Sequence, residues 1–181
     1  MAPDEVVRIT SQRMQQTLSA NREMLKKNPD AIITLVEEIV VPQFDFVRIS
    51  AWVLGKHWRS ATPEQRGRFI KEFQDMLLNT YGTAILEYTD FKITIGPLRM
   101  KEGDRTVMVR SDIEQTGANT ISLDYRMFNG KDGWKVIDIL VDNVSLVANY
   151  RTSFGEEIEQ SGMDALLERL AKRNAEKRSK T

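Results

Sequence analysis

Residues 134–154 change from a strand-like to a helix-like pattern, and this change limits the folds open to the chain. The first part, residues 134–141, is β-branched and apolar, which favours a strand. With strict alternation, one face carries Trp134, Val136, Asp138 and Leu140, and the other carries Ile137, Ile139 and Val141. Because both faces are apolar, we expect both faces of this strand to be covered.

The second part of the stretch follows the spacing of one helix face. Its apolar positions are Leu146, Val147, Tyr150 and Phe154. Asp142 or Asn143 can cap the start of this helix. The sequence therefore predicts a buried strand that turns directly into a helix folding back toward the sheet.

Four helical segments are predicted ahead of the sheet. They cover residues 4–27, 31–40, 44–55 and 62–84, and residues 57–59 form a short link. The first segment has only a thin apolar stripe, so it is expected to lie on the surface of the fold. The fourth begins with the strongest local signal: Thr62 is the N-cap, Pro63 is the first helical residue and Gln65 completes a capping box.

The residues that follow alternate with a period of two and are separated by turn sequences. The predicted strands are centred on residues 91–95, 107–113, 121–127 and 134–141. Asn129-Gly130-Lys131-Asp132-Gly133 is a strong hairpin signal between the last two strands. A further helix starts near Met163. We therefore predict an α+β fold in which several helices pack on a curved, four-stranded antiparallel sheet.

The length of 181 residues fits one domain, spanning residues 1–181. Its basic end, from about residue 172, is predicted to be a solvated and frayed tail. No run reaches the ~18 apolar residues of a membrane span. The start, Met1-Ala-Pro-Asp-Glu5, has no signal peptide and is interpreted as the start of a mature or engineered chain.

Composition excludes several classes of function. Basic and acidic residues balance at 26 each, which argues against nucleic acid as a partner. The absence of cysteine removes disulfides, thiolate nucleophiles and cysteine-ligated metals. His57 is the only histidine, and neither a metal-ligand spacing nor a phosphate-binding glycine loop is present. We predict neither a metal nor a cofactor.

Asp138 is the one carboxylate with a possible chemical role. A carboxylate on the concave face of a helix-covered sheet could act as a general base. It could instead be a structural anchor, paired with Arg126 or Arg151. The residues favour the anchor and leave the base open.

The sequence is also rich in aromatic and aliphatic side chains that could face one interior. Periodicity cannot distinguish a filled core from a cavity lined by the same residues.

One segment, VLGKHWRSATPEQ at residues 53–65, closely resembles a signature of the MlaC family, also called the toluene-tolerance auxiliary proteins. The resemblance continues in order through FIKEF (69–73), LLNTY (77–81), DYR (124–126), GWKVID (133–138), VSLV (144–147), YRTSF (150–154) and GMDAL (162–166). It covers residues 4–174. One departure is Asn143, where the family pattern has glycine. Asparagine tolerates positive φ, so the turn is expected to survive.

The resemblance implies a soluble periplasmic phospholipid carrier and not an enzyme. Its phospholipid is cargo, and its partners are an outer-membrane lipoprotein complex and the lipid-binding ring of an inner-membrane ABC transporter. The acyl chains would lie in an apolar pocket between sheet and helices. The residues assigned to lipid binding are Leu54, Phe69, Phe73, Leu77, Tyr81, Tyr125, Trp134, Val136, Leu146, Val147, Tyr150 and Phe154.

Two alternatives stay open at this point. One is a small-molecule enzyme on a cone-shaped α+β fold with Asp138 as the base. The other is a protein-interaction module.

Overall fold

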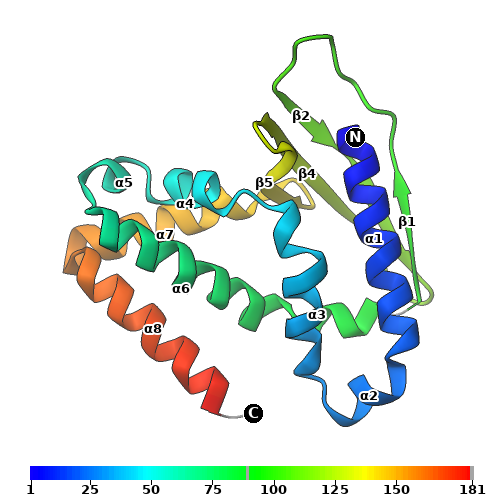
Figure 1. Cartoon of the computed structure of the whole chain (residues 1–181), viewed down its shortest axis with the longest axis horizontal. Coiled ribbons are helices and arrows are strands. Elements are labelled where there is room, and N and C mark those ends of the chain that lie inside the picture. Colours follow the sequence, from blue (N-terminus) through cyan, green and yellow to red (C-terminus); the bar gives the residue numbers. More distant parts are fainter. Residues whose placement is uncertain (89, 180–181) are drawn as a thin grey trace. The chain divides into compact units, whose positions relative to one another are not determined.

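The computed structural model describes residues 1–88 and 90–179, whose helices and strands fall into two units. Unit 1 consists of Met1–Asp45 and Thr83–Leu146, and unit 2 of Phe46–Gly82 and Val147–Thr181. Each unit joins segments that are distant in the sequence (Figure 1). Among the described residues, a helix with the length and hydrophobicity needed to span a bilayer is absent.

Unit 1 is built on an antiparallel sheet. Its strands are β1 Phe91–Ile95, β2 Thr106–Val109, β3 Ser111–Gln115, β4 Ile121–Gly130, β5 Gly133–Val141 and β6 Val144–Ser145. The order is β1-β3-β4-β5-β6, and β2 also pairs with β4. This confirms the predicted α+β fold and the antiparallel sheet. The predicted hairpin is confirmed as well, because Gly130 pairs with Gly133.

The number of strands differs from the prediction: the described residues form six strands, not four. The segment predicted as one strand, residues 107–113, is divided at Arg110 into β2 and β3. The Ser111 amide there donates to the Asp124 carboxylate, with the nitrogen 3.2 Å from Oδ1. This side-chain acceptor replaces a backbone partner for the Ser111 amide, so the pairing between strands can change at this point. As a result, β2 and β3 pair with different parts of β4.

The added strand β6 follows β5 through a two-residue turn. Its residues, Asp142 and Asn143, have φ values of 47° and 67°. Positive φ at both central residues is typical of a type I′ hairpin turn, which asparagine tolerates. The prediction that one of them caps the next helix is wrong. The Asp142 carboxylate instead accepts a hydrogen bond from the Ser122 amide at 3.0 Å.

A β-bulge at Ile137 decides which residues of β5 share a face. Arg126 pairs with Asp138 and Met127 with Val136, which leaves Ile137 as the extra residue. An extra residue reverses the alternation beyond it. One face then carries Trp134, Val136 and Ile139, and the opposite face carries Asp138 and Leu140. The strict alternation predicted for this strand is therefore wrong beyond the bulge.

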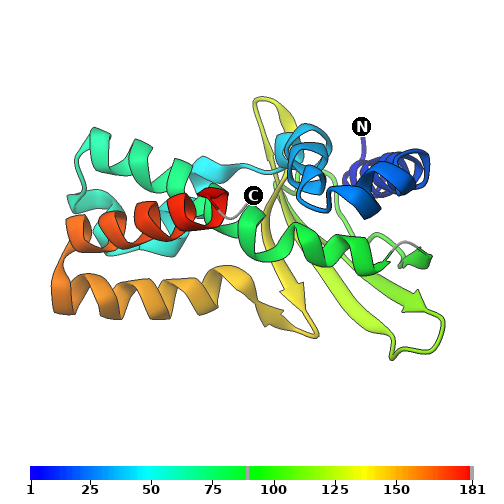
Figure 2. The same cartoon turned by 90° about the horizontal axis from the view of Figure 1, so that it is seen from below.

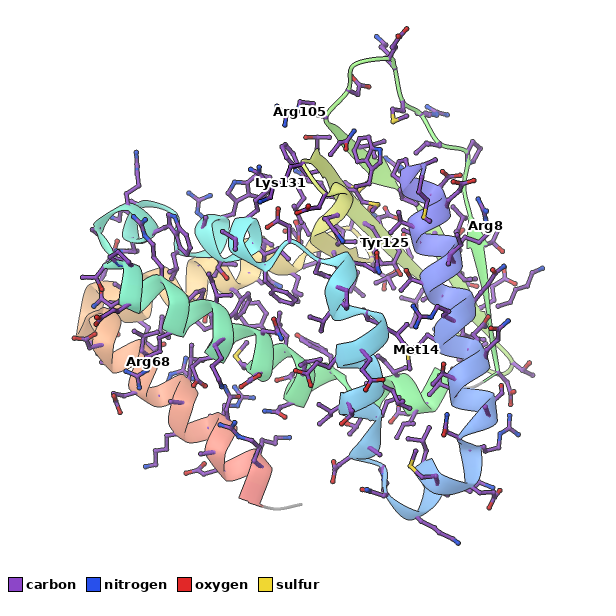
Figure 3. All side chains as sticks on the ribbon, in the orientation of Figure 1. Arg8, Met14, Arg68, Arg105, Tyr125 and Lys131 are labelled. Carbon is purple, nitrogen blue, oxygen red and sulfur yellow. The ribbon has the colours of Figure 1, made fainter. Side chains whose placement is uncertain are left out.

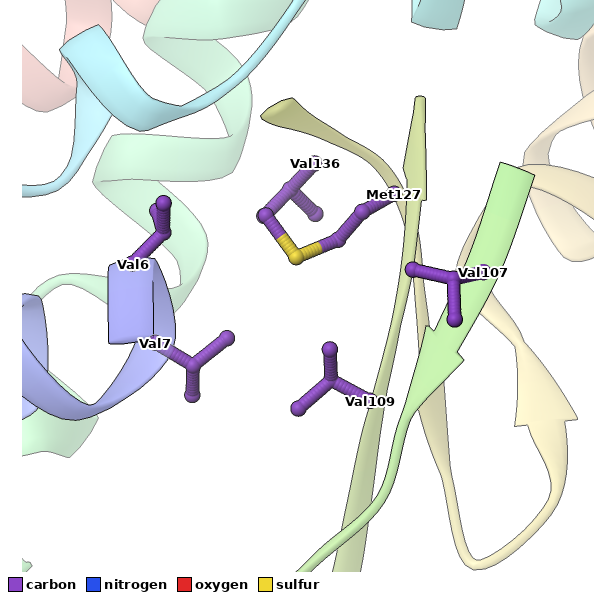
Figure 4. Packing of buried hydrophobic residues seen from close by; sticks show 6 residues of the cluster. All are labelled: Val6, Val7, Val107, Val109, Met127 and Val136. Atoms are coloured by element: carbon purple, nitrogen blue, oxygen red, sulfur yellow. The ribbon is translucent and has the colours of Figure 1, made fainter. Parts of the chain in front are cut away.

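The helices of unit 1 pack beside this sheet. They are α1 Pro3–Ala20, α2 Arg22–Lys27, α3 Ala31–Ile39 and the 3₁₀ turns η1 Val41–Gln43 and η2 Thr83–Tyr88. Val6 and Val7 of α1 pack in one cluster with Val107, Val109, Met127 and Val136 (Figure 4). The predicted first helix is broken at Asn21, because the Asn21 amide side chain donates to the Thr17 carbonyl at 2.8 Å.

Unit 2 consists of helices. They are α4 Phe46–Leu54, α5 Lys56–Ser60, α6 Pro63–Tyr81, α7 Leu146–Ser161, whose first residue belongs to unit 1, and α8 Met163–Ser179. The predicted link at residues 57–59 is instead the short helix α5. Gly55 turns the chain with φ 55°, and the Ala61 amide closes the new turn on the His57 carbonyl. Figure 2 shows α7 turning into α8 at the left of the view. Gly162 lies between the two helices, with a φ of 89°.

The C-terminal helix is longer than predicted, since α8 continues to Ser179 where a frayed tail from about residue 172 was expected. Residues 180 and 181 of that tail lie outside the described residues. Asn174, 1% exposed, explains the difference because its amide donates to the Glu72 carboxylate of α6 at 2.7 Å. Arg68 and Glu168 join the same two helices nearer their start, at 3.0 Å (Figure 3).

The capping box at the start of α6 is present. Thr62 Oγ1 accepts from the Gln65 amide at 3.1 Å, and Gln65 Oε1 accepts from the Thr62 amide at 2.9 Å. Thr62→Ala removes the first bond, so we expect a loss of about 1 kcal/mol in the free energy of unfolding. Urea denaturation measures it, with Thr80→Ala, an exposed threonine in the last turn of α6, as the control. Equal midpoints for the two variants would contradict the assignment.

Candidate functional site

An aromatic cluster connects α6 and α7 in unit 2. The rings of Phe69 and Phe73 stack at 5.3 Å, and Phe154 meets them edge-on at 5.9 and 5.7 Å. Tyr150 meets Phe73 edge-on at 5.3 Å and lies 5.3 Å from Phe154. One turn separates Phe69 from Phe73, and likewise Tyr150 from Phe154, so each helix presents two rings on one face. Four of the twelve residues predicted to bind lipid are therefore in mutual contact.

The cluster has a polar end. The hydroxyl of Tyr150 lies 3.2 Å from the hydroxyl of Tyr81, whose side chain is 45% exposed. Burial, and then the hydrogen bond with Tyr81, raise the pKa of Tyr150 above its ordinary value. Tyr150 therefore stays uncharged through the neutral range. The phenylalanines are buried against one another, so it is the tyrosine end of the cluster that can meet a ligand.

The other three unit 2 residues predicted to bind lipid lie outside the aromatic cluster. Leu54 is buried at the end of α4. Leu77 of α6 and Val147 in the first turn of α7 are half-buried. Half-buried apolar side chains keep surface that a ligand could cover.

The remaining four lie in unit 1, three of them on the sheet. Val136 belongs to the cluster that Val6 and Val7 of α1 cover, and Tyr125 and Trp134 pack against it (Figures 3 and 4). Burial raises the pKa of Tyr125 to about 12. Part of the surface predicted as pocket wall is thus in contact with a helix of the chain itself. The fourth residue, Leu146, is half-buried at the start of α7.

Asp138 lies on the opposite sheet face from Val136 and is 7% exposed. Its carboxylate accepts a hydrogen bond from the Ser145 hydroxyl of β6 at 2.5 Å. This bond ties β5 to β6, next to the backbone pair Leu140–Ser145. The contact supports the structural anchor that the sequence favoured, with Ser145 as a partner that the sequence analysis did not name.

Removing this charge tests the anchor. We expect Asp138→Asn to lower the free energy of unfolding by about 1–2 kcal/mol, because hydrogen bonds to charged groups are the stronger kind. Ser145→Ala should cost a similar amount, and the double variant should cost less than the sum. Thermal and urea unfolding measure all three. An Asp138→Asn protein with the wild-type free energy of unfolding would contradict the anchor interpretation.

A second surface feature was not anticipated from the sequence. A depression of about 380 Å³ in unit 1 is lined by Leu18, Arg22, Leu25, Lys26 and Leu86. The sequence feature that could have indicated this depression is the apolar spacing of Leu18 and Leu25. The break at Asn21 places Leu18 on α1 and Leu25 on α2. In residues 1–88 and 90–179, no group of three His, Asp or Glu side chains could hold a metal ion.

Comparison with known proteins identifies a family. The family model described as MlaC protein matches residues 8–172. The toluene tolerance protein ttg2D of Pseudomonas putida is 31% identical over 163 residues, which are 90% of this chain and 75% of that protein. The intermembrane phospholipid transport system binding protein MlaC of Haemophilus influenzae is 24% identical over 172 residues, covering 93% and 80% of the two chains.

A solved structure is similar over nearly the whole chain. It is the phospholipid-binding protein from Ralstonia solanacearum in complex with a phospholipid, which is 28% identical. The TM-score is 0.89, and the match covers 98% of this chain and 99% of the other.

Proposed function

Because this chain belongs to the MlaC family, we propose that it binds phospholipid and carries it between membranes. The observation that carries the proposal is the likeness, over 98% of the chain, to a protein solved with a phospholipid bound. The relatives named for toluene tolerance and phospholipid transport support it independently.

In finer terms, we propose a periplasmic carrier within a lipid-asymmetry system. It would receive lipid from, or deliver it to, an outer-membrane lipoprotein complex and the lipid-binding ring of an inner-membrane ABC transporter. The phospholipid is cargo, and the protein acts without catalysis or a cofactor. The Asp138–Ser145 hydrogen bond supports the structural anchor over the general base of the enzyme alternative.

The free energy of transferring acyl chains is compatible with the carriage of phospholipid. Removing an acyl chain from water gains about 0.8 kcal/mol per CH₂. The interior of a bilayer is as apolar as a dry protein cavity. A lipid moving from one to the other therefore neither gains nor loses much free energy, and the site needs only to be apolar and dry. Tight binding of the head group would slow release. The hydroxyls of Tyr81 and Tyr150 fit this requirement, because a hydroxyl can hydrogen-bond to a head group without forming an ion pair.

The twelve lipid-contacting residues stay a prediction. The members that keep surface for a ligand are Leu77, Tyr81, Leu146, Val147 and Tyr150. The rings of Phe69, Phe73 and Phe154 are buried and pack on one another, so they support these residues from behind.

Extraction of the purified protein tests the proposed cargo. The full chain is extracted with organic solvent, and the extract is analysed by mass spectrometry and phosphorus assay. We expect phospholipid at a near-stoichiometric yield. A protein purified from phospholipid-rich cells that contains no phosphorus, and that takes up none from vesicles, would overturn the proposal.

A further inference from the structure

The hydroxyl pair of Tyr81 and Tyr150 lies where three helices of unit 2 come together. Tyr81 is the last residue of α6, and Tyr150 lies in the second turn of α7. The third helix is α8, because the Asn79 side-chain amide donates to the Asn174 side-chain carbonyl at 3.3 Å. Asn79 is two residues before Tyr81, so this bond holds the turn of α8 that contains Arg173 beside the end of α6.

The two hydroxyls leave one hydrogen for a ligand. Each hydroxyl has one hydrogen, and the contact of 3.2 Å between the two oxygens uses one of them. Burial first, and then the hydrogen bond with Tyr81, raise the pKa of Tyr150, which is the direction expected when Tyr150 donates. Tyr81, whose side chain is 45% exposed, then keeps its own hydrogen for an acceptor outside the pair.

Arg173 adds a positive charge beside this donor. Burial raises the pKa of Tyr150 most, whereas the charge of Arg173 acts on the same hydroxyl and lowers the pKa. Two other arginines of α8 are neutralised by carboxylates, since Arg169 pairs with Glu157 and Arg178 with Asp75. Within residues 1–88 and 90–179, Arg173 forms no such ion pair, and its side chain is exposed.

Apolar side chains lie one turn away from both hydroxyls. Leu77 precedes Tyr81 by four residues on α6, and Val147 precedes Tyr150 by three residues on α7. Each pair therefore shares a helix face. Both apolar side chains are half-buried. A ligand for this place must combine an apolar part with a negatively charged group that accepts hydrogen bonds.

We infer that Tyr81, with the charge of Arg173 beside it, binds the phosphate of the phospholipid cargo. The inference rests on the proposed function and names the part of the cargo that is recognised. Tyr81 donates its hydrogen to a phosphate oxygen, and the acyl chains continue toward Leu77 and Val147. Arg173 attracts the same phosphate through solvent. Because exposed ion pairs contribute little, this attraction leaves the lipid free to depart.

A competition between a phospholipid and the same lipid without its head group tests the inference. The delipidated full chain is incubated with vesicles of dioleoyl phosphatidylcholine that also contain dioleoylglycerol. After the protein is separated from the vesicles, mass spectrometry gives the ratio of bound phosphatidylcholine to bound dioleoylglycerol. Comparing this ratio between variants cancels the different stabilities of the two lipids in the bilayer.

Tyr81→Phe keeps the ring and removes the hydroxyl. We expect it to lower the ratio roughly two- to tenfold, the size expected for one hydrogen bond. Dioleoylglycerol should be bound at least as well as by the wild type, because its binding does not need the hydroxyl. A merely structural role of Tyr81 would instead reduce the binding of both lipids.

Arg173→Gln should lower the ratio about twofold at low salt, as expected for one exposed charge. The effect should disappear at 1 M salt, where the Debye length is only ~3 Å. Lys172→Gln is the matched control, since Lys172 is the neighbouring exposed cation of α8 and lies about 100° around the helix. The control should keep the wild-type ratio at both salt concentrations.

Inorganic phosphate distinguishes a lipid phosphate from free phosphate as the ligand. Added in excess, it should leave the ratio as sodium chloride of the same ionic strength does, because it has no apolar part. A lower ratio in phosphate than in sodium chloride would assign the site to free phosphate and overturn the inference.

Two results with the lipids would also overturn the inference. They are equal ratios for the wild type and Tyr81→Phe, and a parallel loss of both lipids in that variant. In either case the wild type still binds phospholipid, so the proposed function stands. A wild type that takes up neither lipid would overturn the proposed function together with the inference.

Discussion

Val147→Trp is expected to reduce the phospholipid that the protein retains to less than half of the wild-type amount. Val147 lies half-buried in the first turn of α7, three residues before Tyr150 of the aromatic cluster. If Val147 contacts acyl chains, the indole will occupy room that a chain held, and the delipidated variant will fold with nearly wild-type stability. If the site is packed core, the extra volume will cost ~1–3 kcal/mol or more.

The measurement is a pair: phosphorus per mole of protein as purified, and the melting temperature of each delipidated protein. Val144→Trp is the control, because Val144 is 53% exposed on β6 and receives the same added volume. The control should change neither quantity. A large fall in melting temperature with unchanged phosphorus would place Val147 in the core and defeat its assignment to the lipid site.

Phe73→Ala is expected to be the most destabilising of the substitutions considered. Phe73 is 1% exposed, and its ring contacts those of Phe69, Tyr150 and Phe154. Truncating such a buried phenylalanine typically costs about 3–5 kcal/mol, because apolar contacts are lost and a cavity remains. For a chain of this length the melting temperature should fall by roughly 10 °C.

The control for this prediction is Phe73→Leu, which keeps most of the side-chain volume and should cost less than about 1.5 kcal/mol. Urea unfolding of the delipidated proteins gives both values. If Phe73→Ala keeps the wild-type midpoint, then the ring contacts do not stabilise the empty protein. The cluster would in that case be a compliant cavity wall rather than a packed core.

Features controlled by neighbours along the chain could be predicted from the sequence. The capping box at Thr62 and the hairpin from Asn129 to Gly133 were both confirmed. Asn143 was expected to keep a positive φ, and it does. Each of these depends on residues within about four positions, so a local pattern contains the necessary information.

The candidate site could be predicted only in part. Helical spacing identified Phe69 and Phe73 on one segment, and Tyr150 and Phe154 on another. Spacing along one helix does not say which other helix its rings meet. The ring contacts between α6 and α7 therefore required the structure, as did the finding that Val6 and Val7 cover the sheet beside Val136.

The sequence by itself determined where most helices and strands lie, because hydrophobic period, caps and turn residues act over a few positions. Tertiary structure decided the rest. The bulge at Ile137 moved Asp138 to the opposite face from Val136, since register depends on the partner strand. Asn174 extends α8 by binding Glu72, which is 102 residues away in the chain. Such contacts form only after folding brings distant side chains together, so a single segment contains no sign of them.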